Sequence, residues 1–213
     1  MAIEKFTTRS LIINQYANGE HDTALKVYTE DFGLIVVLAK SLRKREGKLK
    51  AHVRKFHYAN LTIIKGKEIY RLVGATEILL ERKRDTSLMV KFTNDIKIKN
   101  EVVKKQNLIA EVSKLVERMY GGEIKQPSLF NKIFNYISHY YETENNSRDY
   151  SLYRAAIYAT ILIELGHMDA NVLGVRDINE YKNMSIEILL LNTSLYRSSI
   201  SRELHKSIKE SML

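Results

Sequence analysis

The sequence predicts an α+β protein in which an N-terminal five-stranded β-barrel is followed by an all-α C-terminal domain. Short runs rich in β-branched residues, separated by turn signals, fill the first 78 residues. Apolar residues at helical spacing fill the part after residue 100. A chain of 213 residues accommodates one large domain or two small ones. We therefore expect two domains, over residues 1–82 and 83–213.

The strands are expected at residues 10–16, 24–28, 34–39, 58–65 and 67–78. Turn signals at Asn18-Gly19 and Asp31-Phe32-Gly33 separate the first three runs, and Lys65-Gly66-Lys67 is typical of a hairpin between the last two. Gly74 lies inside the last run and predicts a β-bulge. Because five short strands leave unpaired edges unless the sheet closes on itself, a small barrel is the economical arrangement.

The spacing of apolar residues in the C-terminal part predicts three long helices. The first carries its apolar stripe over residues 102–119 and ends before Gly121-Gly122. Pro127 opens the second, and Asp149 or Ser151 is the expected cap of the third, which ends before Gly166. Two further helices are expected at residues 184–192 and 195–212.

Composition excludes several classes of protein. The chain has no cysteine, which excludes disulfides, thiolate zinc sites, iron–sulfur clusters and cysteine nucleophiles. The longest uncharged stretches are far shorter than the ~20 apolar residues of a membrane span. Glu4, Lys5 and Arg9 interrupt any apolar core of a signal peptide, so we expect a cytoplasmic location.

Catalytic and metal-binding patterns are absent from the sequence. Neither His52 nor His57 has a partner at metal-ligand spacing, and the acidic residues are scattered. No phosphate-binding glycine loop, dinucleotide fingerprint or nucleophile elbow occurs. We expect neither an enzyme nor a bound metal or cofactor.

The charge is distributed unevenly along the chain. The net charge is +9, and residues 1–84 carry 17 Lys and Arg against 9 Asp and Glu. Residues 85–213 carry 17 against 16 and are nearly neutral. Such asymmetry indicates that the first part binds a polyanion. Nucleic acid is the favoured polyanion, and an anionic membrane surface is the alternative.

Residues 40–55, here called the basic segment, contain eight basic residues and one acid, Glu46. Such clusters bind phosphate backbones by releasing condensed counterions, although a solvated basic loop has the same composition. Phe56, Tyr58 and Tyr70 flank the segment and, with Tyr16, provide rings on which bases could stack, although each also suits a core. The predicted DNA-binding residues are Lys40, Arg43, Lys44, Arg45, Lys48, Lys50, Arg54, Lys55, Tyr16 and Arg71.

The first half resembles the RecO family of bacterial recombination mediators. The resemblance rests on a spaced pattern in residues 19–44, formed by Gly19, Glu20, Asp22, Thr29, Gly33, Ala39 and Lys40. The strand–Lys-Gly-Lys–strand–Thr-Glu order after Phe56 is similar too. Weaker similarities follow in the family's order: YGGEIKQPSLF, SLYRAAIYATILIELGH and Ser201-Arg202-Glu203-Leu204.

The resemblance implies an N-terminal OB-fold that binds single- and double-stranded DNA. It further implies annealing of complementary strands and help in loading recombinase onto DNA coated by single-strand-binding protein. The implied partners are RecR and the acidic C-terminal tail of that coating protein. The chain departs from the family in having no Cys₄ zinc module, so no zinc is carried over.

Two alternatives remain at this stage. An RNA-binding OB module with a helical partner-docking domain would share these features, because recognition of the 2′-OH leaves no signature here. A peripheral membrane adaptor would need a broad apolar face beside the cations. Leu42, Leu49 and Val53 provide only a thin one.

Overall fold

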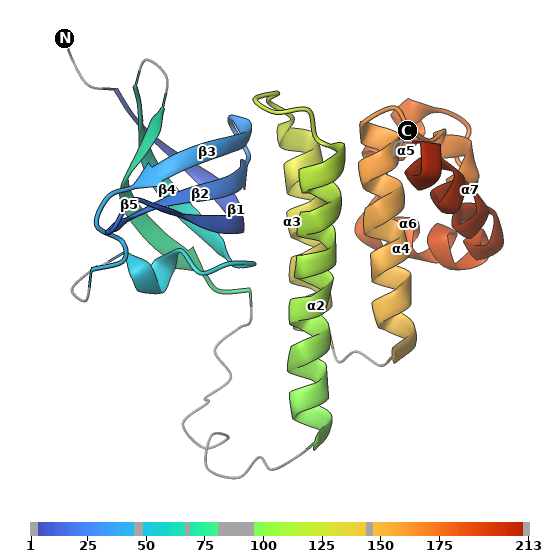
Figure 1. Ribbon diagram of the computed structural model, residues 1–213. Helices are drawn as coiled ribbons and strands as arrows, with labels where there is room; N and C mark the ends of the chain where they lie inside the picture. Colours follow the sequence, from blue (N-terminus) through green and yellow to red (C-terminus); the bar gives the residue numbers. More distant parts are fainter. Residues whose placement is uncertain (1–3, 45–48, 67–68, 81–95, 144–146, 211–213) are drawn as a thin grey trace. The chain divides into compact units, whose positions relative to one another are not determined.

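The computed structural model describes residues 4–44, 49–66, 69–80, 96–143 and 147–210, and it confirms the predicted fold class (Figure 1). A closed five-stranded barrel is followed by helices. None of the helices in these ranges is long and apolar enough to cross a membrane. By their internal contacts the residues form two compact units, Met1–Leu79 with Val116–Phe130, and Leu80–Leu115 with Asn131–Leu213. The boundary predicted at residues 82 and 83 lies outside the described residues.

The barrel has the strand order β1-β2-β3-β5-β4, and β1 pairs with β4 to close it. Every pairing is antiparallel except that of β3 with β5, which is parallel through Val37↔Tyr70 and Leu38↔Arg71. The strands are β1 (Lys5–Asn18), β2 (Asp22–Thr29), β3 (Gly33–Ala39), β4 (Tyr58–Lys65) and β5 (Tyr70–Ile78). All five predicted strands are therefore confirmed, with β1 longer than its apolar run indicated.

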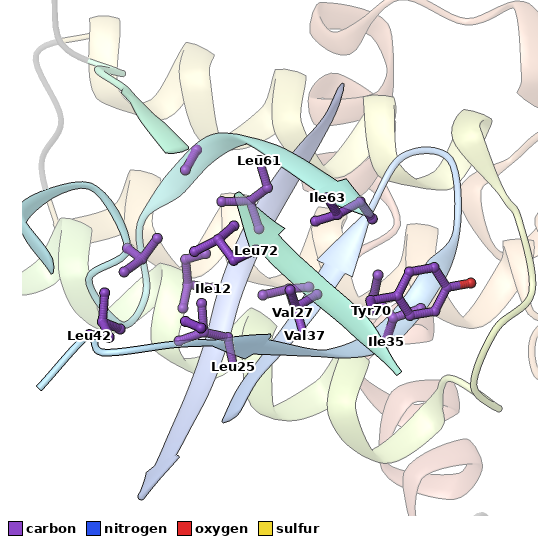
Figure 2. Packing of buried hydrophobic residues seen from close by; sticks show 13 residues of the cluster. Ile12, Leu25, Val27, Ile35, Val37, Leu42, Leu61, Ile63, Tyr70 and Leu72 are labelled. Carbon is purple, nitrogen blue, oxygen red and sulfur yellow. The ribbon is translucent and has the colours of Figure 1, made fainter. Parts of the chain in front are cut away.

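The barrel interior is filled by β-branched and leucine side chains. Because successive side chains of a strand point to opposite faces, alternate residues of each strand enter the core. Figure 2 shows these side chains converging from all five strands, among them Ile12, Val27, Val37, Leu61 and Leu72. The β4–β5 register shifts between Thr62 and Ile63, whose partners are Gly74 and Leu72, which confirms the predicted bulge.

Residues 116–130 belong to the same compact unit as the barrel. They contribute Tyr120 and Phe130, whose rings lie 5.0 and 5.4 Å from that of Tyr28, centroid to centroid. The backbone also takes part, because Leu34 donates its N–H to the carbonyl of Gly122 at 3.0 Å. Sequence reasoning assigned this stretch to the helical part alone, since its contacts with the barrel are remote in sequence.

Polar contacts supplement this packing. Lys26 pairs with Glu117 at 3.0 Å, and Lys125 pairs with Asp31 at 3.1 Å. The Tyr70 hydroxyl donates a hydrogen bond to Glu123 at 3.1 Å. Burial first, and then this bond, raises the pKa of Tyr70.

The helical part contains the predicted long helices and two elements that the sequence did not indicate. The helix from Ser147 begins before the expected caps, Asp149 and Ser151. A 3₁₀ turn and a short helix, capped by Asp169 and Asp177, fill the stretch for which no element was expected. The elements are α2 (Ile96–Met119), α3 (Pro127–Glu142), α4 (Ser147–Glu164), η2 (Ala170–Leu173), α5 (Ile178–Asn183), α6 (Ile186–Leu195) and α7 (Arg197–Glu210).

Polar side chains link the helices of the second unit. Lys132 of α3 pairs with Glu164 of α4 at 2.7 Å, and its ammonium lies 3.8 Å from the ring centroid of Tyr181 in α5. Glu111 of α2 accepts a hydrogen bond from the Tyr150 hydroxyl of α4 at 3.0 Å. The packing of α3, α4 and α5 is therefore fixed partly by charge.

Candidate nucleic-acid interface

The described residues of the basic segment, 40–44 and 49–55, lie between β3 and β4 in the chain, and some of their side chains join the barrel core. Leu42 and Val53 are 5% and 1% exposed and belong to the barrel core, and Leu49 packs against the same cluster. The short turn η1 (Lys50–His52) lies between Leu49 and Val53 and contacts β5. The segment is thus an amphipathic cap, whose apolar side chains enter the barrel.

The cations of this cap face solvent. The structure describes six of the eight predicted basic residues of the segment, and all six are exposed: Lys40, Arg43, Lys44, Lys50, Arg54 and Lys55. Arg45 and Lys48 lie outside the described residues. Since Leu42 and Val53 belong to the barrel core, these cations lie on a folded surface.

Hydrogen bonds attach the cap to the β1–β2 hairpin. Arg43 donates its backbone N–H to the carbonyl of His21 at 3.0 Å and its guanidinium to the carbonyl of Gly19 at 3.2 Å. The N–H of Ser41 bonds the Asp22 carboxylate at 2.8 Å, which holds Ser41 at a φ of 55°. The Gln15 side chain donates to the carbonyl of Val53. The first part of the cap therefore has a defined backbone path.

Glu77 on β5 is the acidic neighbour of the cap. Its carboxylate pairs with the guanidinium of Arg54, which is half-exposed, and lies 3.8 Å from the Nε2 atom of His57. The Lys55 ammonium lies 4.8 Å from the ring centroid of Phe56. Arg54 is thus partly neutralised in the free protein, whereas the structure shows no ion pair for the other described cations of the cap.

The four aromatic residues considered from the sequence have different positions. Tyr58 and Tyr70 are 1% and 6% exposed, so they belong to the packed interior and not to a stacking surface. Phe56 is half-buried at the end of the cap. Tyr16 is 47% exposed on β1 and is available to a ligand, and Arg71 is exposed on β5. Sequence alone did not distinguish these rings, because each of them suits a packed core as well as a stacking surface.

Metal ligands do not gather in the described part of the chain, where no group of three His, Asp or Glu side chains is close enough to hold an ion. The exposed groups of the described basic segment are ammonium and guanidinium groups, and Tyr16 of β1 is an exposed phenol ring. In nucleic-acid-binding proteins, groups of the first kind contact phosphates, and aromatic rings stack on unpaired bases.

Comparison with known proteins gives a match for the barrel. Residues 1–78 match the family model described as "Recombination protein O N terminal". Together with the closed five-stranded barrel, this match confirms the predicted OB-fold.

The curated relatives agree with the family match. The "DNA repair protein RecO" of Dehalococcoides mccartyi strain 195 is 38% identical over 73 residues, which are 34% of this chain and 29% of that protein. The protein of the same name from strain CBDB1 is 36% identical over 73 residues, with the same coverage. The similarity therefore spans less than a third of these relatives.

Proposed function

Residues 1–78 belong to the RecO N-terminal domain family, and on this premise we propose that the chain is a DNA-binding recombination mediator in DNA repair. It binds single- and double-stranded DNA, anneals complementary strands, and assists the loading of recombinase onto DNA coated by single-strand-binding protein. RecR and the C-terminal tail of the coating protein are its proposed partners, and the recombinase is reached indirectly. No covalent chemistry is required of it.

The amphipathic cap is the observation that supports this proposal. Its six described cations are exposed, while Leu42 and Val53 fix it to the barrel. Phosphate contacts of this kind position a strand without reading its sequence. A mediator needs such contacts, because it must hold, slide and release strands of any sequence.

Annealing follows from the same electrostatics. Two complementary strands repel each other through their phosphates, and cations between them reduce that repulsion. Base pairing then supplies the free energy, so the protein needs no nucleotide hydrolysis. Arg43, Lys44 and Lys50 are exposed and suited to this role.

A salt titration tests the proposal. Labelled single-stranded DNA is titrated with the full chain at several salt concentrations. If about five cations touch phosphates, log K against log salt falls with a slope of about −3.5. A slope near zero contradicts electrostatic backbone binding.

A matched pair of variants locates the site. Replacing Lys40, Lys44 and Lys50 by Gln should reduce the steepness of the salt slope by about 2, since each lost phosphate contact removes about 0.7. The control replaces Lys182, Lys206 and Lys209, which are equally exposed on α5 and α7. Equal loss in both variants would exclude the cap as the principal site. Annealing assays with DNA and RNA oligonucleotides distinguish the RNA-binding alternative.

A further inference from the structure

Helix α6 is apolar on its solvent face as well as on its buried face. It contacts α4 and α7 (Figure 1), and its buried side chains are Leu189, Leu190 and Thr193. A surface helix normally carries polar side chains opposite its buried face. On α6 the exposed side chains include three large apolar ones: Ile188 at 46%, Leu191 at 58% and Leu195 at 68% exposure.

These three residues, here called the α6 stripe, lie along one line of the helix. Residues three and four positions apart on a helix are neighbours on the same side, so spacings of three and then four residues give a continuous stripe. Charges of opposite sign lie at its two ends. Glu187 is exposed in the first turn of α6, and Arg197, also exposed, lies two residues beyond Leu195.

The stripe is held in a fixed shape by the helix that carries it. The Ser185 hydroxyl accepts the N–H of Ile188 at the start of α6, at 3.5 Å. The Thr193 hydroxyl donates to the Leu189 carbonyl at 2.7 Å. At the end of the helix the ring of Tyr196 lies against Gly174, where an added Cβ would collide with it. A surface organised in this way loses little entropy when it binds a partner.

We propose that the α6 stripe binds a second copy of this chain, with the two α6 helices packed antiparallel about a twofold axis near Leu191. A twofold interface brings the same patch of both subunits together. In this arrangement Leu191 faces its own symmetry mate, and Ile188 faces Leu195 of the partner subunit. The inference goes beyond the proposed function and does not depend on it.

The charges at the ends of the stripe favour a second copy over other occupants. Antiparallel packing places Glu187 beside Arg197 of the partner subunit, and symmetry repeats this pair at the other end. Opposite charges that meet across an interface fix its register and orientation. A nucleic acid or an acidic peptide would instead meet an apolar surface with a carboxylate, that of Glu187, at one end.

The size of the patch indicates a reversible dimer. Tyr196 is 42% exposed and extends the stripe, so four large apolar side chains form a patch on the order of 400 Å². A standard interface buries about 800 Å² on each partner, of which the apolar centre is one part and the polar rim another. We therefore expect association at micromolar concentrations, with dissociation on dilution.

Sedimentation velocity of the full chain tests the proposal. Between about 1 and 100 µM the wild-type mass should rise from that of one chain toward that of two. Leu191→Glu places two carboxylates at the twofold axis and should raise the dissociation constant by at least ~10-fold. The matched control is Val103→Glu, since Val103 is 52% exposed on α2 and should leave association unchanged. Thermal unfolding checks that both variants are folded.

Cross-linking identifies the residue at the axis. The natural chain has no cysteine, so Leu191→Cys introduces a single thiol. Facing Cα atoms of two packed helices lie about 5 Å apart, within the ~4.4–6.8 Å that a disulfide spans. Mild oxidation should therefore convert Leu191→Cys into a covalent dimer, and Val103→Cys should remain largely monomeric.

Charge reversal tests the antiparallel arrangement. Glu187→Lys and Arg197→Glu should each weaken association, because each places like charges together, and the double variant should restore it. A double variant no better than either single one overturns this arrangement. A wild-type protein that stays monomeric at about 100 µM overturns the interface. So does a Leu191→Glu protein that dimerises like the wild type, or equal cross-linking of the two cysteine variants.

Discussion

Replacing Gly33 by Ala tests whether residues 116–130 stabilise the barrel. Gly33 begins β3 with a φ of +71°, in the left-handed region that an L-residue avoids. A Cβ at this position would lie 2.5 Å from the carbonyl oxygen of Ile124 and 2.9 Å from that of Gly122. Both contacts are with backbone atoms, so the segment itself must move.

The expected destabilisation has two contributions. The left-handed conformation costs about 1–2 kcal/mol for a residue with a Cβ. Moving the segment breaks the hydrogen bond from the Leu34 N–H to the Gly122 carbonyl, which contributes roughly 1 kcal/mol. Gly33→Ala should therefore lower the free energy of unfolding by about 2–3 kcal/mol.

Gly19→Ala is the matched control. Gly19 has a φ of +67°, but nothing lies within 4 Å of its added Cβ. This variant should lose only the ~1–2 kcal/mol of the conformational contribution. Urea unfolding, followed by circular dichroism, measures both variants. Equal destabilisation of the two would refute the claim that residues 122–124 pack against the barrel strongly enough to resist displacement.

Three further predictions concern the cap, a metal and a tyrosine. Glu77→Gln should tighten the binding of single-stranded DNA several-fold, because it removes the ion pair with Arg54 and leaves that guanidinium free for a phosphate. Fluorescence titration measures the affinity, and an unchanged affinity would contradict a role of the Arg54–Glu77 pair. Chelator should change neither far-ultraviolet circular dichroism nor DNA binding, and loss of helix on its addition would reveal a metal site in this cysteine-free chain. Burial, then the hydrogen bond to Glu111, raises the pKa of Tyr150 to about 12. Its stabilising contribution is therefore complete below pH ~10, the unfolded pKa, and is lost as the pH rises toward 12. Tyr150→Phe should flatten the decline in stability over that range, and parallel wild-type and variant stability curves would contradict the shift.

The sequence alone was sufficient for the elements whose signals are local. Each of these signals determines the backbone conformation of only a few neighbouring residues. Examples are the runs rich in β-branched residues, Gly121-Gly122 at a helix end and Pro127 at a helix start. The fold class, the five strands and the concentration of charge in residues 40–55 follow from such signals. Exposure of individual side chains was not determined in this way, as Lys105 illustrates: it looks like a surface lysine, but it is 8% exposed and donates to the Tyr141 carbonyl.

The candidate site required tertiary structure because its parts meet across distant stretches of chain. In the sequence, Leu42 and Val53 are two isolated apolar residues among basic ones. In the structure they are buried in the barrel core and attach the basic segment to the barrel. Tyr16 and Tyr58 have similar sequence surroundings, but only Tyr58 is buried. The pairing of Tyr16 with Ala24 and of Leu38 with Arg71 is a matter of strand register, which depends on how the whole barrel closes. Barrel closure depends on the β-bulges and on the burial of apolar side chains from all five strands together. No local sequence pattern determines that joint packing.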